Sequence, residues 1–396
     1  MRSAIRNGAV QQYPQVVACR QWLMMAALPV VWLLPLLVLL GACQSPKPED
    51  KQREGICYAK GFRLESAGTG GQLLTVVLDS ASGLNAYYVC GEGNGQLQDS
   101  VRILPPSPKR IVCLSTTHIG FLAALGAADR IVGVSGVDWV SSPEVRKRID
   151  AGLVEDVGPV EDLNIERILA LKPDLVVSYS LGNGDPEYAH LWELGVPVLM
   201  VNEFREEHPL GRAEWVKVFG FLTQSQEQAD LQFMRLAKRY DSVAEASGQA
   251  TSRPTVLLNA PWKECWYIPG TRSYMARLVE DAGGRLLTAG YEDGGSHSVN
   301  FEVALGLGMQ ANFWLNPGSY QSLGELAALH PAYAGFPSVE RRNVYNNTKR
   351  LNPSGGNDFY ERGVMEPDVL LEDLQWIFHP ELAPPGYDPV YYVRLR

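Results

Sequence analysis

The stretch "NIERILALKPDLVVSYS", Asn164 to Ser180, sets the pattern from which the fold can be read. Its apolar residues first recur at helical spacing, a Lys-Pro pair then ends the helix, and an apolar strand follows. A weaker copy, "VNFEVALGLGMQANFWLNP", covers Val299 to Pro317. In both copies Asn, an apolar residue and a Glu follow one another, and these acids are Glu166 and Glu302. The chain therefore repeats one helix–strand unit with an acid near each helix start.

Strands and helices alternate around each copy. The runs "RIVCLS", "RIVGVSG" and "PVLMVN" read as strands separated by short helical segments, and "PTVLLNA" begins a second series of the same kind. This alternation is typical of a parallel sheet with crossover helices. We therefore predict an α/β fold of two lobes with parallel-type sheets flanked by helices. The N-terminal lobe is expected over 105–210, a long linking helix, single or broken once, over 211–248, and the C-terminal lobe over 249–396.

A small β meander is expected before the first lobe. Residues 55–104 contain strand-like runs separated by Gly-rich turns. Cys57 and Cys90 lie at the ends of such runs, and an exported chain can keep disulfides, so we predict that they pair. Cys113 and Cys265 are interpreted as packing residues.

The N-terminus has the composition of an export signal. Within residues 1–42 a basic start is followed by a long apolar run with small residues at its end. The final "LGAC" resembles the bacterial lipoprotein signal, in which Cys43 carries lipid and begins the mature chain. The alternative is a retained transmembrane helix, because the run is nearly long enough to span a bilayer. Residues 43–54 are predicted to be a flexible tether, so we expect a protein exported to the periplasm or cell envelope and lipid-anchored to a membrane.

Charge and motifs exclude several classes of function. The net charge is −9, and the first 42 residues contribute three Arg and no acid, so the body of the protein is more acidic still. An acidic body argues against nucleic acid as a partner. The sequence contains no G-x-S-x-G elbow, no P-loop and no H-E-x-x-H motif, so catalysis has little support.

A family resemblance rests on the runs "KRIVCLS", "ALGAADRIVGVS" and "VGPVEDLNIERILALKPDLVV". They resemble the substrate-binding proteins of bacterial ABC importers for ferric siderophores, haem and vitamin B12. In the second lobe "CWYIPGTRSYMARLVEDAGG" and "VNFEVAL" are similar too. In that family each lobe offers one Glu to arginines of the permease dimer, and the resemblance assigns this docking to Glu166 and Glu302. The alternative is that both acids only favour the helix dipole. The implied partners are the permease dimer with its ATPase and a small-molecule metal chelate.

A ligand site is expected in a cleft between the lobes, because ligands of open α/β sheets bind outside the carboxyl ends of the strands. Aromatic side chains there offer flat contact area, and Arg neutralises anionic groups, which suits a large metal chelate with negative charge. The predicted ligand-binding residues are Trp139, Tyr179, Arg205, Trp262, Trp266, Tyr267, Arg272 and Tyr274.

A resident metal or cofactor is not predicted; the ligand itself is expected to be an iron or cobalt chelate. His118 follows the first strand, where relatives that bind bare zinc or manganese place a ligand, but the chain has no H-x-H or H-x-x-x-H spacing. An axial contact to haem iron remains open, and the sequence does not decide whether His118 or His297 contacts ligand. A ferric siderophore is the first candidate, with vitamin B12 or haem as alternatives. A tetrapyrrole chelatase-like enzyme is the alternative of another class, against which the lipoprotein signal speaks.

Overall fold

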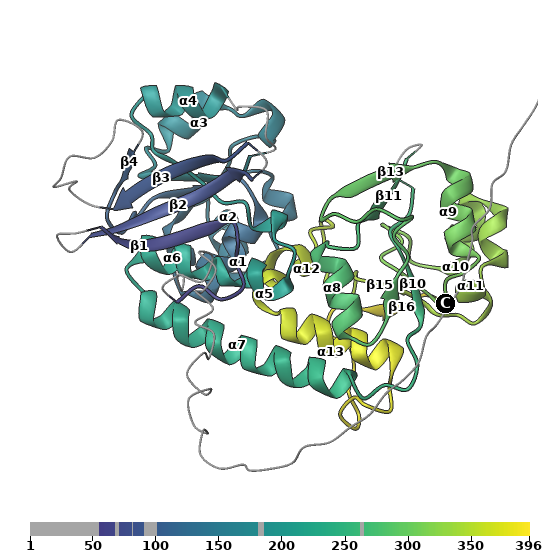
Figure 1. Cartoon of the computed structure of the whole chain (residues 1–396). Coiled ribbons are helices and arrows are strands. Elements are labelled where there is room, and N and C mark those ends of the chain that lie inside the picture. The colour runs from purple at the N-terminus through teal and green to yellow at the C-terminus, as the bar shows by residue number, and fades with distance from the viewer. Residues whose placement is uncertain (1–54, 68–70, 81, 91–100, 181–185, 262–264) are drawn as a thin grey trace, which may run out of the picture. The chain divides into compact units, whose positions relative to one another are not determined.

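Two sheets organise the part of the chain that the computed structural model describes, which is residues 55–67, 71–80, 82–90, 101–180, 186–261 and 265–396 (Figure 1). The first lobe contains a five-stranded sheet in the order β7-β6-β5-β8-β9, and every neighbouring pair is parallel. Buried residues, mostly Val, Ile and Leu, fill every strand except the edge strand β7, as expected for a sheet covered on both faces. The strands are β5 (Ile111–Cys113), β6 (Ile131–Val134), β7 (Glu155–Asp156), β8 (Leu175–Ser178) and β9 (Val198–Met200).

Short capped helices connect these strands. The hydroxyl of Ser115 accepts from Thr117 N at the start of α1, and that of Ser142 accepts from Val145 N at the start of α2. Such N-caps satisfy backbone donors that a helix start leaves free. The connecting elements are α1 (Thr116–Ala124), η1 (Ala128–Arg130), η2 (Val137–Trp139), α2 (Pro143–Asp150), η3 (Val160–Asp162), α3 (Ile165–Ala170), α4 (Pro186–Glu193) and η4 (Glu203–Arg205).

The second lobe repeats this architecture with a sheet in the order β12-β10-β14-β15-β16. Its first four strands are parallel and only the edge strand β16 is antiparallel, so the predicted α/β class with parallel-type sheets is confirmed. A separate antiparallel pair, β11 with β13, lies beside it. The elements are β10 (Thr255–Leu258), β11 (Trp266–Pro269), α8 (Tyr274–Asp281), β12 (Arg285–Leu286), β13 (Ser296–Val299), α9 (Phe301–Gly308), β14 (Phe313–Leu315), α10 (Leu323–Leu329), η5 (Pro331–Gly335), α11 (Pro337–Glu340), β15 (Val344–Asn346) and β16 (Val393–Arg394).

Three helices form the connection between the lobes: α5 (Pro209–Glu214), α6 (Val216–Thr223) and α7 (Gln226–Ser247). The chain breaks between α6 and α7 at Gln224, whose φ is +60°. The C-terminal helix α13 (Pro367–Phe378) packs along α7, as Figure 1 shows.

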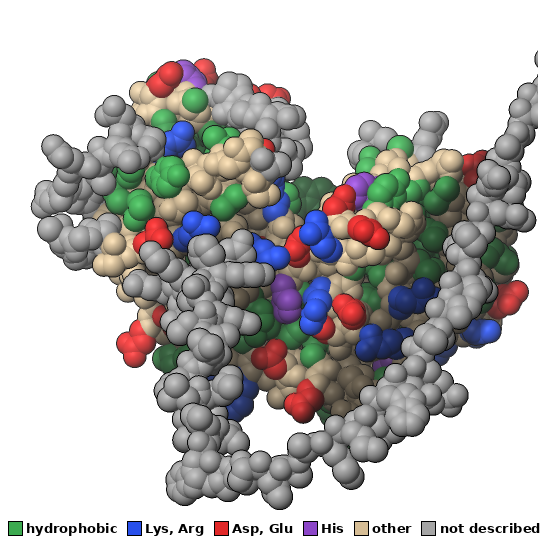
Figure 2. All heavy atoms as spheres, viewed as in Figure 1, with side chains coloured by type: hydrophobic (Ala, Val, Ile, Leu, Met, Phe, Trp, Pro, Cys, Tyr) green, Lys and Arg blue, Asp and Glu red, His purple; other side chains and the backbone are tan. Residues whose placement is uncertain are grey.

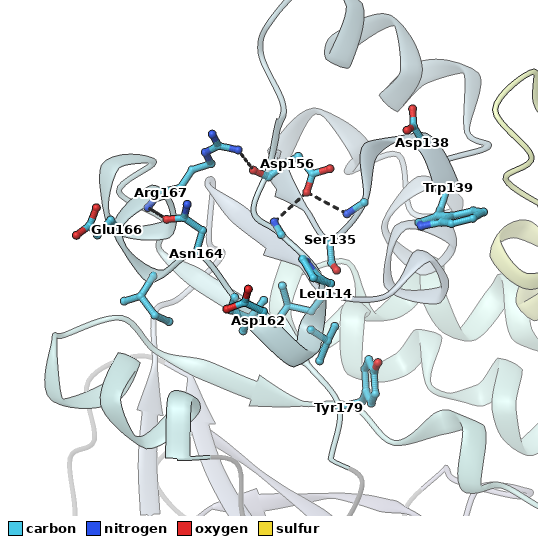
Figure 3. Close-up of a pocket in the computed structure, with 16 residues that line it drawn as sticks. Leu114, Ser135, Asp138, Trp139, Asp156, Asp162, Asn164, Glu166, Arg167 and Tyr179 are labelled. Atoms are coloured by element: carbon cyan, nitrogen blue, oxygen red, sulfur yellow. Dashed lines mark hydrogen bonds between the residues drawn. The ribbon is translucent and has the colours of Figure 1, made fainter.

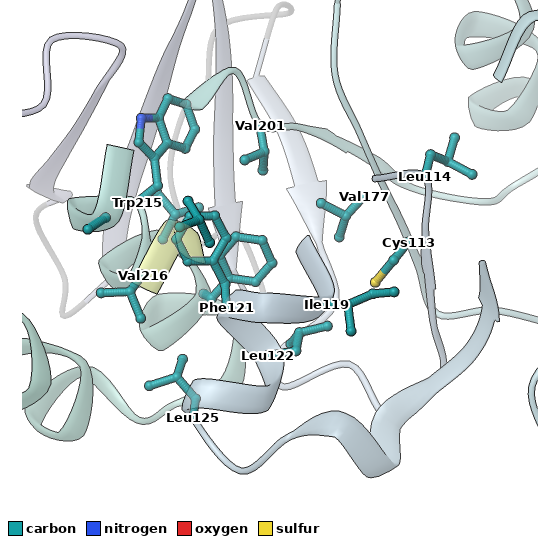
Figure 4. Close-up of a cluster of buried hydrophobic side chains, with 14 of the residues drawn as sticks. Cys113, Leu114, Ile119, Phe121, Leu122, Leu125, Val177, Val201, Trp215 and Val216 are labelled. Carbon is teal, nitrogen blue, oxygen red and sulfur yellow. The ribbon is translucent and has the colours of Figure 1, made fainter. Parts of the chain in front are cut away.

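The C-terminal segment is not confined to the second lobe. Both α12 (Asp358–Glu361) and η6 (Arg362–Met365) pack against α1 of the first lobe. The approach is close: a Cβ on Gly120 would lie 2.3 Å from the Glu361 carbonyl oxygen. Part of the segment 249–396, which was expected to form the C-terminal lobe, therefore packs on the first lobe instead. Figure 4 shows part of the apolar core of the first lobe, where Phe121 stacks on Phe219 with ring centroids 4.9 Å apart.

The N-terminal extension is a four-stranded sheet that packs on the first lobe. Its strands β1 (Phe62–Ala67), β2 (Gly71–Asp79) and β3 (Leu84–Cys90) are antiparallel neighbours. However, β4 (Val101–Leu104) pairs parallel to β3, so the sheet is not the simple meander that was predicted. The ring of Phe62 lies 4.9 Å from that of Trp215, which joins the extension to the first lobe's core.

The predicted disulfide is absent, since Cys57 and Cys90 are both free thiols. Each cysteine is held by a different part of the fold. The backbone N–H of Cys57 donates to Glu214 Oε1 at 2.9 Å, which fixes it on α5, whereas Cys90 pairs opposite Leu104 at the end of β3. Cys43, the signal and the whole tether lie outside the described residues. In the described ranges, no helix combines the length and apolar character needed to span a membrane.

Candidate functional site

The carboxyl ends of the first-lobe strands open onto a cavity of about 1150 Å³ (Figure 3). Asp156 organises its wall, because its carboxylate accepts from Gly136 N, Val137 N and Gly158 N at 3.2, 3.1 and 2.9 Å. These bonds hold the turn that leads into Trp139. The Asp156 carboxylate is therefore occupied by backbone donors of this loop and is not available to a ligand.

A second cavity of about 600 Å³ lies between the lobes. Thr116 and Trp139 come from the first lobe, and Asn316, Asn347 and Tyr360 from the second. Trp139 lines both cavities, and 58% of its surface is exposed. A large indole that is open to solvent and shared by two cavities offers flat apolar area to a ligand.

Residues of the second lobe hold the Trp139 loop in place. Asn352 Nδ2 donates to the carbonyl oxygens of Asp138 and Val140, each at 2.8 Å. The loop also passes close to Gly356, where a Cβ would lie 2.5 Å from the Trp139 carbonyl oxygen. The position of Trp139 is therefore set jointly by both lobes.

The Glu361 carboxylate strengthens the same connection. It accepts from Ser141 N at 2.6 Å and Ser142 N at 2.7 Å, although it belongs to α12. Burial raises the pKa of Glu361 to about 7, and the two backbone donors oppose this rise.

A network of amides forms the second-lobe side of the cleft. Asn347 Nδ2 donates to the Tyr360 hydroxyl at 3.3 Å, and Asn357 Nδ2 donates to Asn347 Oδ1 at 3.4 Å. Asn316 follows β14 with φ +55°, a left-handed conformation that Asn tolerates better than most residues. Sequence reasoning did not select these asparagines. For Asn347 and Asn357 the signal available was the Asn-rich run that begins at the end of β15, "NNTKRLNPSGGND".

The arginines near the cleft are engaged by the protein itself. Arg205 donates to the carbonyl oxygens of Leu78 and Ser180 at 2.8 and 2.9 Å, which ties β2 to the first lobe. Arg272 Nε lies 3.5 Å from Glu207 Oε1, across the two lobes. Figure 2, viewed as Figure 1, shows basic and acidic side chains next to one another in the middle of the visible face. The two arginines that were predicted to neutralise a ligand thus have structural partners.

The predicted aromatic residues separate into cleft and core. Trp139 and Tyr179 line the first-lobe cavity. Trp266 is only 2% exposed, stacks on Trp314 at 5.7 Å and donates from Nε1 to Leu258 O, which contradicts a ligand-binding role. Tyr267 on β11 is 38% exposed and lines neither cavity.

The two remaining predicted residues are Tyr274 and Trp262. The ring of Tyr274 is covered by the guanidinium of Arg212 at 4.2 Å, where α8 meets α5. Trp262 lies outside the described residues.

Comparison with known proteins now decides the family. A family model described as periplasmic binding protein matches residues 111–351, which is more than half of the chain. The chain belongs to the periplasmic binding protein family. Periplasmic binding proteins of ABC importers are exported, bind small-molecule solutes and work with a permease and its ATPase; they are not enzymes.

Solved periplasmic binding proteins share the fold. A periplasmic haem binding protein from Pseudomonas aeruginosa matches with a TM-score of 0.55 and 20% identity, covering 73% of this chain and 98% of that one. A possible iron-binding protein from Staphylococcus epidermidis matches with a TM-score of 0.54 and 18% identity, covering 69% and 99%. At these identities the likeness concerns the fold alone.

Sequence relatives extend over most of this periplasmic binding protein. Two uncharacterized lipoproteins of Methanocaldococcus jannaschii are each 25% identical; one match covers 72% of this chain and 69% of the relative, the other 89% and 90%. A vitamin B12-binding protein of Yersinia pestis is 37% identical over 92 residues, which is 23% of this chain and 30% of that protein.

His118 and His297, which the sequence left open as ligand contacts, both pack against rings of this periplasmic binding protein itself. His118 is fully buried beside Phe219, and burial lowers its pKa to about 3, so the ring is neutral and faces the core. His297 Nε2 lies 2.6 Å from Asp293 Oδ1, and its ring stacks on Tyr291. Within the described ranges, no group of three or more His, Cys, Asp or Glu side chains could hold a metal ion.

Glu166 and Glu302 occupy equivalent positions in the two lobes. Each is exposed and is the second residue of its helix, α3 or α9. Asn164 Oδ1 accepts from Arg167 N at 2.9 Å, and the Asn300 cap of α9 makes the same bond at the same distance. Figure 3 shows Glu166 at the outer end of the cavity, away from Trp139 and Tyr179. The repeated sequence unit therefore presents one carboxylate on each lobe.

Proposed function

We propose that this protein is the lipid-anchored solute-binding component of an ABC importer and that its solute is a metal chelate, with a ferric siderophore as the first candidate. The observation that carries this proposal is the cleft of about 600 Å³ between the lobes, with the exposed indole of Trp139 on one side and Tyr360 on the other. Cavities of this size suit small-molecule ligands, which occupy roughly 300–1,000 Å³.

Vitamin B12 and haem are the alternative solutes. The relatives described as vitamin B12-binding and haem-binding support the general class of metal chelates. All three solutes are large, and the ring systems of haem and vitamin B12 offer broad flat area that gains from burial against aromatic side chains.

Delivery to the permease is assigned to Glu166 and Glu302. A permease with two similar halves needs two equivalent contacts, and the exposed carboxylates on α3 and α9 supply one from each lobe. Arg on the permease would pair with each carboxylate through charge-assisted hydrogen bonds.

Membrane attachment is assigned to Cys43 through "LGAC". The description of two relatives as lipoproteins supports this assignment. A lipid-anchored carrier stays close to its permease, which raises its effective concentration there.

The test of solute binding is isothermal titration of the purified protein with a ferric tris-hydroxamate, cyanocobalamin and haem in turn. Replacing Trp139 by Ala should weaken the solute that binds by about tenfold or more, because aromatic contact area is lost. Leu153→Ala is the matched control, since Leu153 is 56% exposed in the same lobe and lines neither cavity. Failure of all three solutes, and of a ferric tris-catecholate, to bind a folded protein would refute the proposal.

A further inference from the structure

We infer that the cleft selects an electrically uncharged metal chelate that carries hydrogen-bond donors, such as amide N–H groups, over anionic chelates. This inference rests on the proposed function and names the class of solute within it. It reverses the sequence-based expectation of an anionic chelate held by Arg205 and Arg272.

The first observation is the composition of the cleft. Among the described residues that line the cavity of about 600 Å³ there is no Lys, Arg, His, Asp or Glu. Its polar groups are amides and hydroxyls, and the phenol of Tyr360 is neutral at pH 7 because tyrosine ionises only near about pH 10. Such a surface can hydrogen-bond an uncharged solute without compensating a charge.

The second observation is that nearby guanidinium groups already have carboxylate partners. Arg350 Nε lies 2.7 Å from Asp358 Oδ2, and Arg212 Nη2 lies 3.8 Å from Glu203 Oε1. The contact of Arg272 with Glu207 is of the same kind. An anionic chelate would therefore have to leave water without gaining an unpaired cation from these groups.

The third observation concerns the negative charges that line the first-lobe cavity of about 1150 Å³, which shares Trp139 with the cleft. Its lining includes the exposed acids Asp138, which directly precedes Trp139 in the chain, and Asp162. Arg167, the single arginine among the described residues that line it, donates from Nη1 to the Asp156 carbonyl oxygen at 2.8 Å. Acidic side chains around a cleft repel anions and leave an uncharged solute unaffected.

The fourth observation is an acceptor that has no donor. Asn316 lines the cleft, is only 8% exposed, and its side-chain oxygen Oδ1 is buried without a hydrogen-bond partner. A buried acceptor without a partner is unfavourable, and a donor from a ligand would relieve it. Amide N–H or hydroxyl groups supply such a donor, whereas carboxylate and catecholate oxygens would place a second acceptor against the first.

The experiment compares four probes by isothermal titration with the full-length protein: an uncharged ferric tris-hydroxamate, uncharged cyanocobalamin, a trianionic ferric tris-catecholate and haem with its two carboxylates. We expect one of the uncharged probes to bind at least about 100-fold more tightly than either anionic probe, because two or more unpaired charges must be desolvated. Tighter binding of an anionic probe would overturn the inference while supporting the proposed function. Binding of none of them would refute both.

Two variants test the mechanism of selection. Asn316→Gly removes the amide and tolerates the positive φ, so it should weaken the uncharged probe by about tenfold, whereas Asn85→Gly on β3 should not. Thr348→Lys places a cation in the cleft wall and should improve binding of the tris-catecholate relative to the tris-hydroxamate. Thermal unfolding confirms that each variant is folded. Unchanged affinity of Asn316→Gly for the uncharged probe would show that the amide argument is wrong. An unchanged ratio of tris-catecholate to tris-hydroxamate affinity in Thr348→Lys would show that the charge argument is wrong.

Discussion

Arg212 places its guanidinium 4.2 Å from the centre of the Tyr274 ring, so a cation of α5 covers an aromatic side chain of the second lobe. The same guanidinium lies 3.8 Å from Glu203, which is only 3% exposed. One side chain thus compensates a buried carboxylate and joins the two lobes, and its loss has consequences that can be measured.

Replacing Arg212 by Ala should lower the free energy of unfolding by about 3 kcal/mol at pH 8, because the buried Glu203 charge loses its partner. Burial raises the pKa of Glu203 and Arg212 opposes that rise, so the variant should raise this pKa further. A carboxyl with a raised folded pKa loses stability as pH increases through that value, so the deficit should be smaller at pH 5. Urea unfolding of the wild-type protein and of Arg212→Ala at pH 5 and pH 8 measures this loss of stability. Arg235→Ala, at an exposed position on α7, is the control, and an equal deficit at both pH values would contradict the explanation.

The Glu361 carboxyl should give the protein a stability that falls between about pH 4 and pH 7, which are the pKa values of the unfolded and folded states. Its pKa in the folded protein is about 7, raised by burial, so the stability it contributes is complete below its unfolded pKa and is lost as pH rises through 7. Glu361→Gln cannot ionise. We expect its unfolding free energy to depend less on pH in this range, by about 1–3 kcal/mol. Guanidinium unfolding at several pH values is the measurement; parallel pH profiles would exclude a titrating Glu361.

The double variant Glu166→Arg with Glu302→Arg should abolish uptake while solute affinity stays normal. Each substitution should lower the free energy of unfolding of the free protein only slightly, since a charge in the first turn of an exposed helix contributes about 0.3–1 kcal/mol. In the docked complex, loss of one partner of a desolvated pair costs about 2–5 kcal/mol. The assay is solute uptake and ATPase stimulation with the permease in vesicles. Glu227→Arg is the control, because Glu227 is also an exposed first-turn residue, on α7. Full uptake by the double variant would mean that both acids are only helix-start residues.

Replacing Glu214 by Ala should loosen the segment that precedes β1. The buried Glu214 carboxylate accepts from Cys57 N, Tyr58 N and Ala59 N at 2.9, 2.7 and 2.8 Å. Its removal leaves three backbone donors without their acceptor, each worth about 1 kcal/mol. Hydrogen exchange at residues 57–59 should become much faster, with exchange in β5 unchanged.

The control for that variant is Glu207→Ala, whose carboxylate is 30% exposed and pairs with Lys60 and Arg272. Glu207→Ala should lower the free energy of unfolding by at most about 1 kcal/mol, because partly exposed ion pairs contribute no more than that. Equal effects of the two substitutions on exchange would show that burial of the Glu214 carboxylate is unimportant.

Cys43→Ser should release the protein from the membrane fraction, because the thiol that receives the lipid is missing. Fractionation of cells that express each form, followed by immunoblotting, is the measurement. Cys265→Ser serves as the control for loss of a thiol. A Ser variant that still partitions entirely with membranes would favour a retained apolar helix over a lipid anchor.

The sequence alone determined the features that depend on local chemistry. Alternating apolar strands and capped helices predicted two lobes with parallel sheets, because the pattern of short apolar runs and helix stops is a local property. Glu166 and Glu302 could be placed for the same reason. Their Asn caps and their distance from the helix start are fixed by adjacent residues in the chain.

Only the tertiary structure decided which of the remaining side chains are available to a ligand. Trp139 and Trp266 both follow or flank strand-like runs, yet one is exposed in the cleft and the other stacks on Trp314 in the core. Arg205 looks like a free cation in sequence, but it is bound by the carbonyl oxygen of Leu78, 127 residues away. Burial and pairing depend on residues brought together by folding, so no local pattern could reveal them.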